Sequence, residues 1–165
     1  MGCLDNFYTG SRSNIDEHIN HPGFVVIEQN VIEPINLNID EIYNLVCLAS
    51  PVHDQKEPTK SLKPVLFSPK NLLRLARDSQ AKILQTLTSE VCGNPEIHPQ
   101  TESYWSNADP VGVQTCYDEG KRCAETLFFD ANRQYDVNIK FMRIFNNYGL
   151  NMRSEDSSVV CNFIM

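Results

Sequence analysis

Short apolar runs alternate along the chain with longer amphipathic stretches, which indicates strands that alternate with helices. This alternation is typical of an α/β fold with a parallel sheet, because each crossover returns the chain to the same end of the sheet. We expect helices on the faces of one parallel sheet built from runs near Gly2, Phe24, Ile42, Ile83 and Ile139.

Prolines complicate the longest helix expected between these runs. Ser13–Ile19 is expected to form a short helix with Ser13 as its N-cap. Residues 57–80 are expected to form a crossover helix, but Pro64 and Pro69 each remove a backbone donor and clash with the preceding turn. Each such proline costs about 3 kcal/mol in a helix interior. We therefore expect this helix to be broken before Pro69.

The last helix opens in the string CYDEGK at residues 116–121. Thr115 is its expected N-cap. Gly120 costs roughly 1 kcal/mol in a helix relative to alanine and therefore indicates close approach of a neighbouring element. Small and apolar residues at helical spacing predict the buried stripe, namely Cys116, Gly120, Cys123, Leu127 and Ala131.

Tyr117 and Lys121 lie one turn apart on this helix, and therefore on one face. An ammonium beside a phenol favours the phenolate and lowers the phenol pKa from about 10 toward neutrality, which makes tyrosine a usable base. A solvated helix face is the alternative interpretation of the pair. Thr88, Ser89 and Glu90 favour a site, because they follow a strand and open parallel sheets place sites at the carboxyl ends of strands.

Composition narrows the class of protein. The chain has 165 residues and a formal net charge of -7, which disfavours nucleic acid and anionic membranes as partners. It has no apolar run of membrane-spanning length and no N-terminal signal, so we expect a cytoplasmic protein. The six cysteines form no CxxC pair and are expected to be reduced and buried. His18 and His21 lack companion ligands, and no metal site is expected.

Several strings resemble one family. Thr88 to Val91, the Tyr117 and Lys121 pair, and RIFN at residues 143–146 resemble the extended short-chain dehydrogenase/reductases. Within that superfamily the chain is similar to the UDP-glucuronate decarboxylase (UDP-xylose synthase) family. The similarity extends over nearly the whole chain, in the strings DNFYTGSRSNI, ASPVH, HPQTESYW, CYDEGKRCAETL and VVCNFI.

The resemblance implies a Rossmann-like, doubly wound parallel sheet, NAD as cofactor and a UDP-sugar as substrate. It implies that Tyr117 is the base, helped by Lys121 and Thr88, and that Ser89 and Glu90 assist decarboxylation. The implied cofactor residues are Asp5, Asn6, Thr9, Gly10, Asn30, Val31 and Ala49, together with Tyr117 and Lys121. The implied substrate residues are Ser50, Pro51, Asn146 and Asn162.

The sequence also departs from this family. It holds no Gly-rich GxxGxxG segment, so we expect the fold to lack the first strand, the Gly-rich loop and the first helix, and also most of the C-terminal substrate domain. Asp54 and Val65 stand where the family has Tyr and Asn, and Asn30 replaces an Asp. For Asp5, a ribose ligand and a plain strand-end turn are equally good interpretations.

Two functional hypotheses follow. In the first, residues 1–165 are a single truncated NAD-binding domain that converts UDP-glucuronate to UDP-xylose. In the second, the chain is a degenerate, non-catalytic fragment that pairs with a full-length homologue; a homodimer is also possible. Another sugar-nucleotide epimerase or dehydratase is disfavoured by the strings CYDEGKR and ASPVH.

Overall fold

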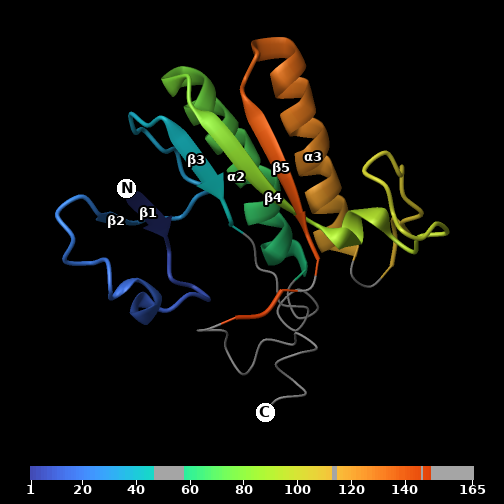
Figure 1. Cartoon of the computed structure of the whole chain (residues 1–165), viewed down its shortest axis with the longest axis horizontal. Coiled ribbons are helices and arrows are strands. Elements are labelled where there is room, and N and C mark those ends of the chain that lie inside the picture. Colours follow the sequence, from blue (N-terminus) through green and yellow to red (C-terminus); the bar gives the residue numbers. More distant parts are fainter. Residues whose placement is uncertain (47–57, 113–114, 146, 150–165) are drawn as a thin grey trace.

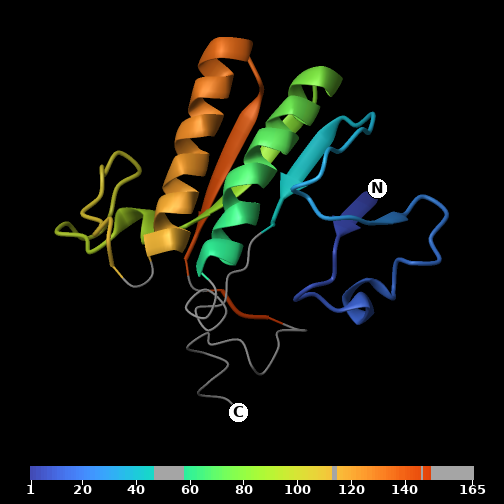
Figure 2. The same cartoon turned by 180° about the vertical axis from the view of Figure 1, so that it is seen from behind.

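The computed structural model describes residues 1–46, 58–112, 115–145 and 147–149. The strands are β1 (Gly2–Asp5), β2 (Val25–Glu28), β3 (Glu41–Asn44), β4 (Lys82–Thr88) and β5 (Ile139–Ile144). The long helices are α2 (Pro58–Ser79) and α3 (Thr115–Tyr135), and the short 3-10 helices are η1 (Arg12–Ile15) and η2 (Ser89–Cys92). Figures 1 and 2 show α2 and α3 side by side on one face of β3, β4 and β5.

All strand pairs are parallel, as the alternating pattern predicts, and the α/β fold class is confirmed. β1 pairs with β2, and β3, β4 and β5 form a sheet in that order. The prediction of one continuous sheet is wrong, because the hydrogen bonds divide into a two-stranded and a three-stranded sheet. Within the described residues no strand lies between β1 and β3 to carry the ladder across.

The core lies between the three-stranded sheet and the two long helices. Ile83 at the start of β4 and Phe128 of α3 are among its most deeply buried side chains. Leu4 of β1 also packs against this core, so the smaller sheet is attached to it. The buried core residues are Val31, Ile35, Leu72, Leu73, Leu75, Ala76, Ile83, Phe128, Ala131 and Val137.

Helix α2 is continuous, so the predicted break before Pro69 is wrong. Pro58 is its first residue, a position that needs no backbone donor. Pro64 and Pro69 lie inside the helix, and Pro69 and Ser68 are almost completely buried. We attribute the unbroken helix to this burial against α3 and the sheet, which offsets the local cost of the prolines.

Helix α3 packs against α2 through Gly120, which confirms the predicted close approach. A Cβ atom on Gly120 would lie only 2.9 Å from Val65 Cγ1 and 3.2 Å from Leu62 Cδ1. The predicted stripe is wrong at Cys123 and Leu127, which are exposed. The buried residues of α3 are Gly120, Lys121, Ala124, Phe128 and Ala131. Gly120 and Ala131 are buried as predicted, Ala124 and Phe128 take the places of Cys123 and Leu127, and the buried face includes the lysine.

Polar side chains of α2 hold the connection that follows β2. The Asn71 amide donates to the carbonyls of Val31 and Glu33, at 3.0 Å each. Arg74 donates to the Ile35 carbonyl at 2.9 Å, and Ser79 to the Leu37 carbonyl at 3.1 Å. The chain between β2 and β3 therefore lies along α2 with many of its backbone acceptors satisfied.

Two predicted caps differ from the structure. Ser11, not Ser13, caps η1, and its hydroxyl accepts the Ser13 amide hydrogen. Thr115 is the first residue of α3 itself, and its hydroxyl donates to the carbonyls of Gly112 at 2.7 Å and Asp109 at 3.0 Å. No helix among the described residues is both long and apolar enough to cross a membrane.

Candidate functional site

The carboxyl end of β4 carries three of the predicted catalytic residues. Thr88 ends the strand and is 8% exposed. Its hydroxyl oxygen accepts the amide hydrogen of Glu90 at 3.3 Å and so caps η2. Ser89 is half-buried and Glu90 is exposed. The turn therefore places a hydroxyl and a carboxylate side by side at the sheet edge.

Lys121 reaches the same edge from α3. Its side chain is only 3% exposed, and its ammonium Nζ donates to the Thr86 carbonyl at 3.2 Å, two residues before Thr88. The same Nζ lies 5.8 Å from the centroid of the half-buried Tyr117 ring, within the range of a cation–π contact. The structure thus brings Tyr117, Lys121 and the end of β4 together, as the spacing predicts.

A buried polar network supports the carbonyl that holds Lys121. Thr86 O also accepts a hydrogen bond from the Gln85 side-chain amide at 2.8 Å. The Gln85 amide oxygen in turn accepts from Asn44 of β3 at 2.6 Å, and the Thr86 hydroxyl donates to the Asn44 carbonyl at 2.9 Å. Asn44, Gln85 and Thr86 are all buried. Because buried hydrogen bonds are costly to leave unmade, this network fixes β3 against β4 beside Lys121.

This arrangement suits proton transfer to and from a substrate hydroxyl. A fixed ammonium beside a phenol stabilises the phenolate. A phenolate within reach of a hydroxyl can act as a general base, and the phenol formed can later act as a general acid. The Thr88 and Ser89 hydroxyls and the Glu90 carboxylate supply further hydrogen-bonding groups on the same edge.

Six of the predicted cofactor residues lie at or follow the carboxyl ends of β1 and β2: Asp5, Asn6, Thr9, Gly10, Asn30 and Val31. Asp5 Oδ1 accepts the Phe7 amide hydrogen at 2.7 Å, and Asn6 Oδ1 accepts that of Tyr8 at 3.1 Å. A Cβ atom on Gly10 would lie 3.8 Å from the Asp5 carboxylate, so the loop through Thr9 and Gly10 returns beside it. This contact keeps both interpretations of Asp5 open, since the residue shapes a turn and still exposes a carboxylate.

The second part of this group follows β2. Asn30 Oδ1 accepts the Ile32 amide hydrogen at 3.2 Å, and Val31 is buried in the core. Asp5 and Glu28 are register partners, so the two strands end together. An exposed carboxylate that can accept from vicinal hydroxyls fits a ribose. Burial, and then the charge of Asp5, raise the pKa of the nearby Cys3 thiol above its ordinary value.

Part of the predicted site lies outside the described residues. This applies to Ala49, Ser50 and Pro51 in the turn after β3, to Asn146 after β5, and to Asn162. It also applies to Asp54. Val65, where the resembled family has a polar residue, is buried against Gly120.

Two arginines beside the site were not given a role by sequence reasoning. Arg122 Nη1 donates to the Val91 carbonyl at 3.3 Å and also to the Ser106 hydroxyl. Arg143 forms an ion pair with Glu125 at 2.7 Å that is three-quarters or more buried. Both arginines lie in strings that sequence reasoning singled out, CYDEGKR and RIFN. Their contacts could not be predicted, because Val91, Ser106 and Glu125 are distant from them in the sequence.

A pocket of about 410 Å³ opens between α3, β5 and residues 102–105. Its arginines are each paired with a carboxylate: Arg122 with Glu119, Arg133 with Asp130 and Arg143 with Glu125. None of the predicted site residues lines it, but Val91 and Arg122, which directly follow Glu90 and Lys121, do, so the pocket adjoins the candidate site.

The described part of the chain contains four cysteines. Of the cysteines in the described part, Cys92 is buried, Cys3 and Cys116 are half-buried and Cys123 is exposed, and all are free. The prediction that the cysteines are buried is therefore wrong for Cys123, which lies on the solvent side of α3. Within the described residues no group of three or more His, Cys, Asp or Glu side chains is placed to hold a metal ion.

Comparison with known sequences supports the resemblance drawn from the motifs. UDP-glucuronic acid decarboxylase 6 of Arabidopsis thaliana is 50% identical over 160 residues, which are 97% of this chain and 47% of that protein. UDP-glucuronic acid decarboxylase 1 of Danio rerio is 43% identical over 162 residues, which are 98% of this chain and 39% of that protein. The chain spans less than half the length of these relatives.

Solved structures agree on the fold. A UDP-N-acetylglucosamine 4-epimerase from Methanobrevibacter ruminantium matches 99% of this chain and 53% of its own length, with a TM-score of 0.86 and 21% identity. A dTDP-glucose 4,6-dehydratase from Streptomyces venezuelae, solved with NAD bound, matches 99% of this chain and 51% of its own, with a TM-score of 0.85 and 18% identity. The family model described as the NAD dependent epimerase/dehydratase family matches residues 3–165. The chain therefore belongs to the NAD dependent epimerase/dehydratase family.

Proposed function

We propose that this chain catalyses the NAD-dependent decarboxylation of UDP-glucuronate to UDP-xylose. The observation that carries the proposal is the position of Lys121: its buried ammonium binds the Thr86 carbonyl and faces the Tyr117 ring at the carboxyl end of β4. The identity of 50% with a UDP-glucuronic acid decarboxylase supports this reaction over others of the family.

The proposed roles follow from the chemistry of each group. NAD, when bound, would supply a hydride acceptor and donor. Tyr117, as phenolate, removes the proton of the 4-hydroxyl while the carbon 4 hydrogen leaves as hydride, so the carbon becomes a ketone. Lys121 stabilises the phenolate, and the Thr88 hydroxyl donates a hydrogen bond to the reacting oxygen.

The 4-ketone is β to the sugar carboxylate, which permits loss of carbon dioxide. The bond between carbons 5 and 6 breaks and carbon dioxide leaves, the electron pair forms the enolate of the 4-ketone, and carbon 5 then takes a proton that comes from solvent. Glu90 and Ser89 assist this step beside the ketone. Return of the hydride to carbon 4 and of the Tyr117 proton to its oxygen completes UDP-xylose and restores the phenolate.

The residues at the ends of β1 and β2 would hold the adenosine half of NAD, and Tyr117 and Lys121 its nicotinamide half. In this proposal residues 1–165 act as a single NAD-binding domain. Ala49, Ser50, Pro51, Asn146 and Asn162 keep their proposed ligand roles from the resemblance. A cytoplasmic location is also proposed; the free thiols of the described cysteines support it, because the cytosol keeps thiols reduced.

The proposal is tested by incubating the purified chain with NAD and UDP-glucuronate and by following UDP-xylose and carbon dioxide. Tyr117→Phe and Lys121→Met should each lower the rate by about 100-fold or more, which is the usual contribution of a positioned acid–base group. Tyr135→Phe is the matched control, since Tyr135 is a half-exposed tyrosine at the far end of the same helix. An unchanged rate in Tyr117→Phe would reject the proposed base.

The competing function is a non-catalytic chain that pairs with a full-length homologue or a second copy. It predicts no product from the chain alone, and a stable complex when the full-length relative is added. Size-exclusion chromatography with light scattering distinguishes a monomer, a homodimer and such a mixed complex.

A further inference from the structure

Residues 93–106, part of the connection between η2 and α3, form a closed loop. The backbone N–H of Asn107 donates to the Cys92 carbonyl at 3.1 Å, and the backbone N–H of Asn94 donates to the Asn107 carbonyl at 2.8 Å. Gly93 has a φ of 62°, and a Cβ atom on it would lie 2.3 Å from the Asn107 carbonyl oxygen. The two ends of this loop are thus in backbone contact, at a place where only glycine fits.

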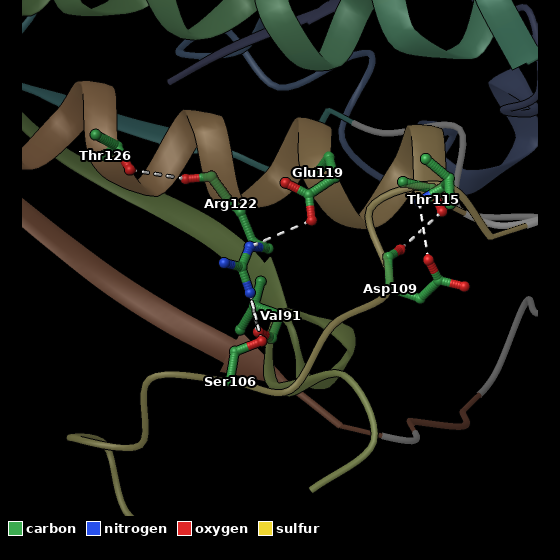
Figure 3. A network of polar contacts seen from close by, with 8 residues as sticks. Val91, Ser106, Asp109, Thr115, Glu119, Arg122 and Thr126 are labelled. Atoms are coloured by element: carbon green, nitrogen blue, oxygen red, sulfur yellow. Dashed lines mark hydrogen bonds and ion pairs between the residues drawn. The ribbon is translucent and has the colours of Figure 1, made fainter.

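Arg122 binds both of these ends at once. Its Nη1 donates to the Val91 carbonyl at 3.3 Å and to the Ser106 hydroxyl, on either side of the loop. Its Nε is paired with Glu119 Oε1, one turn back on α3, at 3.4 Å. Figure 3 shows the guanidinium between Glu119, Ser106 and Val91, with a separate contact of Thr115 to Asp109 at the start of the helix.

We call the contacts of Arg122 with Val91 and Ser106 the clamp. The clamp lies close to the candidate site because Arg122 directly follows Lys121 in α3. Successive residues on a helix point about 100° apart, so Lys121 turns into the sheet while Arg122 turns along it to η2. Val91 directly follows Glu90, whose amide is bound by Thr88. One helix thus carries Lys121 to Thr86 and Arg122 to the end of the turn that contains Ser89 and Glu90.

We propose that Arg122 is a positioning residue of the site: it fixes the Ser89–Glu90 turn relative to the Tyr117–Lys121 face of α3. The catalytic part of this inference rests on the proposed function, whereas the clamp itself does not. A guanidinium is suited to the task because its planar fork donates in several fixed directions, whereas a lysine ammonium in the same place is a mobile point charge.

The clamp can be measured on the chain without substrate. Trp105 is the single tryptophan, is 94% exposed and precedes Ser106, so its fluorescence anisotropy reports motion at the clamped end. Arg122→Gln should lower this anisotropy and speed hydrogen exchange of the Glu90 and Asn107 amides by about tenfold. Ser106→Ala should lower the anisotropy less, since the Val91 contact remains.

Arg77→Gln is the matched control. Arg77 lies in the last turn of α2, forms an exposed ion pair with Asp78, and does not line the pocket that contains Trp105 and Arg122. It should leave both readouts at their wild-type values. Equal changes in Arg122→Gln and Arg77→Gln, or no change in either, would overturn the clamp.

Catalysis tests the positioning role. Arg122→Gln should lower kcat by about tenfold to 100-fold with little change in KM for UDP-glucuronate, and Arg122→Lys should recover part of the loss. An unchanged kcat per folded molecule would reduce Arg122 to a structural residue and overturn the positioning role. If the wild-type chain gives no product, the proposed function fails, and the anisotropy and exchange measurements still decide the clamp.

Discussion

The polar side chains at the carboxyl ends of the two sheets differ in how deeply they are buried. At the end of β4, Lys121, Thr88 and the Asn44–Gln85–Thr86 network are buried between the sheet and the helices. At the ends of β1 and β2, Asp5 and Asn6 are exposed and Asn30 is half-buried, and each binds a nearby backbone amide in a loop.

This difference indicates how each half is specified. The site at the end of β4 depends on non-local packing, because Lys121 contacts a residue of β4 that lies 35 positions away in the sequence. The loops after β1 and β2 depend on local turns, in which a side chain binds a backbone amide two residues ahead. Substitutions in the first half should therefore affect stability and catalysis together, whereas those in the second half should affect ligand contacts with little effect on the fold.

The largest effect on stability is expected from Phe128→Ala. Phe128 is completely buried and packs at 5.7 Å against the ring of Phe141 in β5. Its truncation should lower the free energy of unfolding by about 3–5 kcal/mol. Val25→Ala in β2, where the side chain is 57% exposed, should change it by less than about 0.5 kcal/mol. Urea denaturation of both variants tests the contrast, and comparable losses would contradict it.

A smaller effect is expected from the buried amide pair. Asn44→Leu removes the donor to Gln85, and Gln85→Met removes its acceptor, so each leaves a buried polar group unpaired. Each substitution should cost about 1–3 kcal/mol. The double variant should lose less unfolding free energy than the sum of the two single variants, because neither the donor nor the acceptor of this hydrogen bond is then left unpaired. Strict additivity in the double-mutant cycle would show that the pair is not coupled.

Gly120→Ala probes the contact between the helices. Alanine gains about 1 kcal/mol of helix propensity, but its Cβ would lie 2.9 Å from Val65 Cγ1. Overpacking of this kind costs about 1–3 kcal/mol, so we expect a net loss of about 1 kcal/mol in unfolding free energy. Cys123→Ala, at an exposed position of the same helix, should be neutral or slightly stabilising. A stabilised Gly120→Ala chain would show that the contact can relax.

The smallest effect concerns Cys3 beside the loops after β1 and β2. Burial and then Asp5 raise the pKa of its thiol above its ordinary value, so the folded state holds this proton more tightly than the unfolded chain does. Its contribution to stability is therefore present below the ordinary thiol pKa and is lost as the pH rises through the higher folded pKa. The pH dependence of Cys3 alkylation should show an inflection above that of an ordinary thiol, and Asp5→Asn should move it down. An inflection that does not respond to Asp5→Asn would separate the two residues.

The sequence was sufficient to locate the strands and to place Tyr117 and Lys121 on one face of a helix. Apolar runs located the strands, and helical spacing placed Tyr117 and Lys121 on one face because the periodicity of a helix is fixed. Glycine at position 120 indicated the close helix contact, since an absent side chain in a helix interior needs a packing reason. These inferences rest on local rules that tertiary structure does not alter.

The failures have a common physical cause. Each failure involves contacts between segments that are distant in the sequence. Helix α2 continues through Pro69, which is buried. Lys121 is buried whereas Cys123 is exposed, and Arg122 contacts Val91 and Ser106. Proline cost and hydrophobicity are local quantities, and burial against a neighbouring helix or strand outweighs them. The split into two sheets has the same origin, because hydrogen bonds between strands are set by which elements lie beside each other.

The central claim is that the edge formed by Thr88, Tyr117 and Lys121 removes and returns the carbon 4 hydrogen of UDP-glucuronate. The most direct measurement uses UDP-glucuronate labelled with deuterium at carbon 4, incubated with the chain and NAD, with the product analysed by mass spectrometry and NMR. The account predicts UDP-xylose that keeps its deuterium at carbon 4, formed more slowly than from unlabelled substrate and lost with Tyr117→Phe. Loss of the deuterium to solvent, or no product from a folded chain shown to bind NAD, would contradict it.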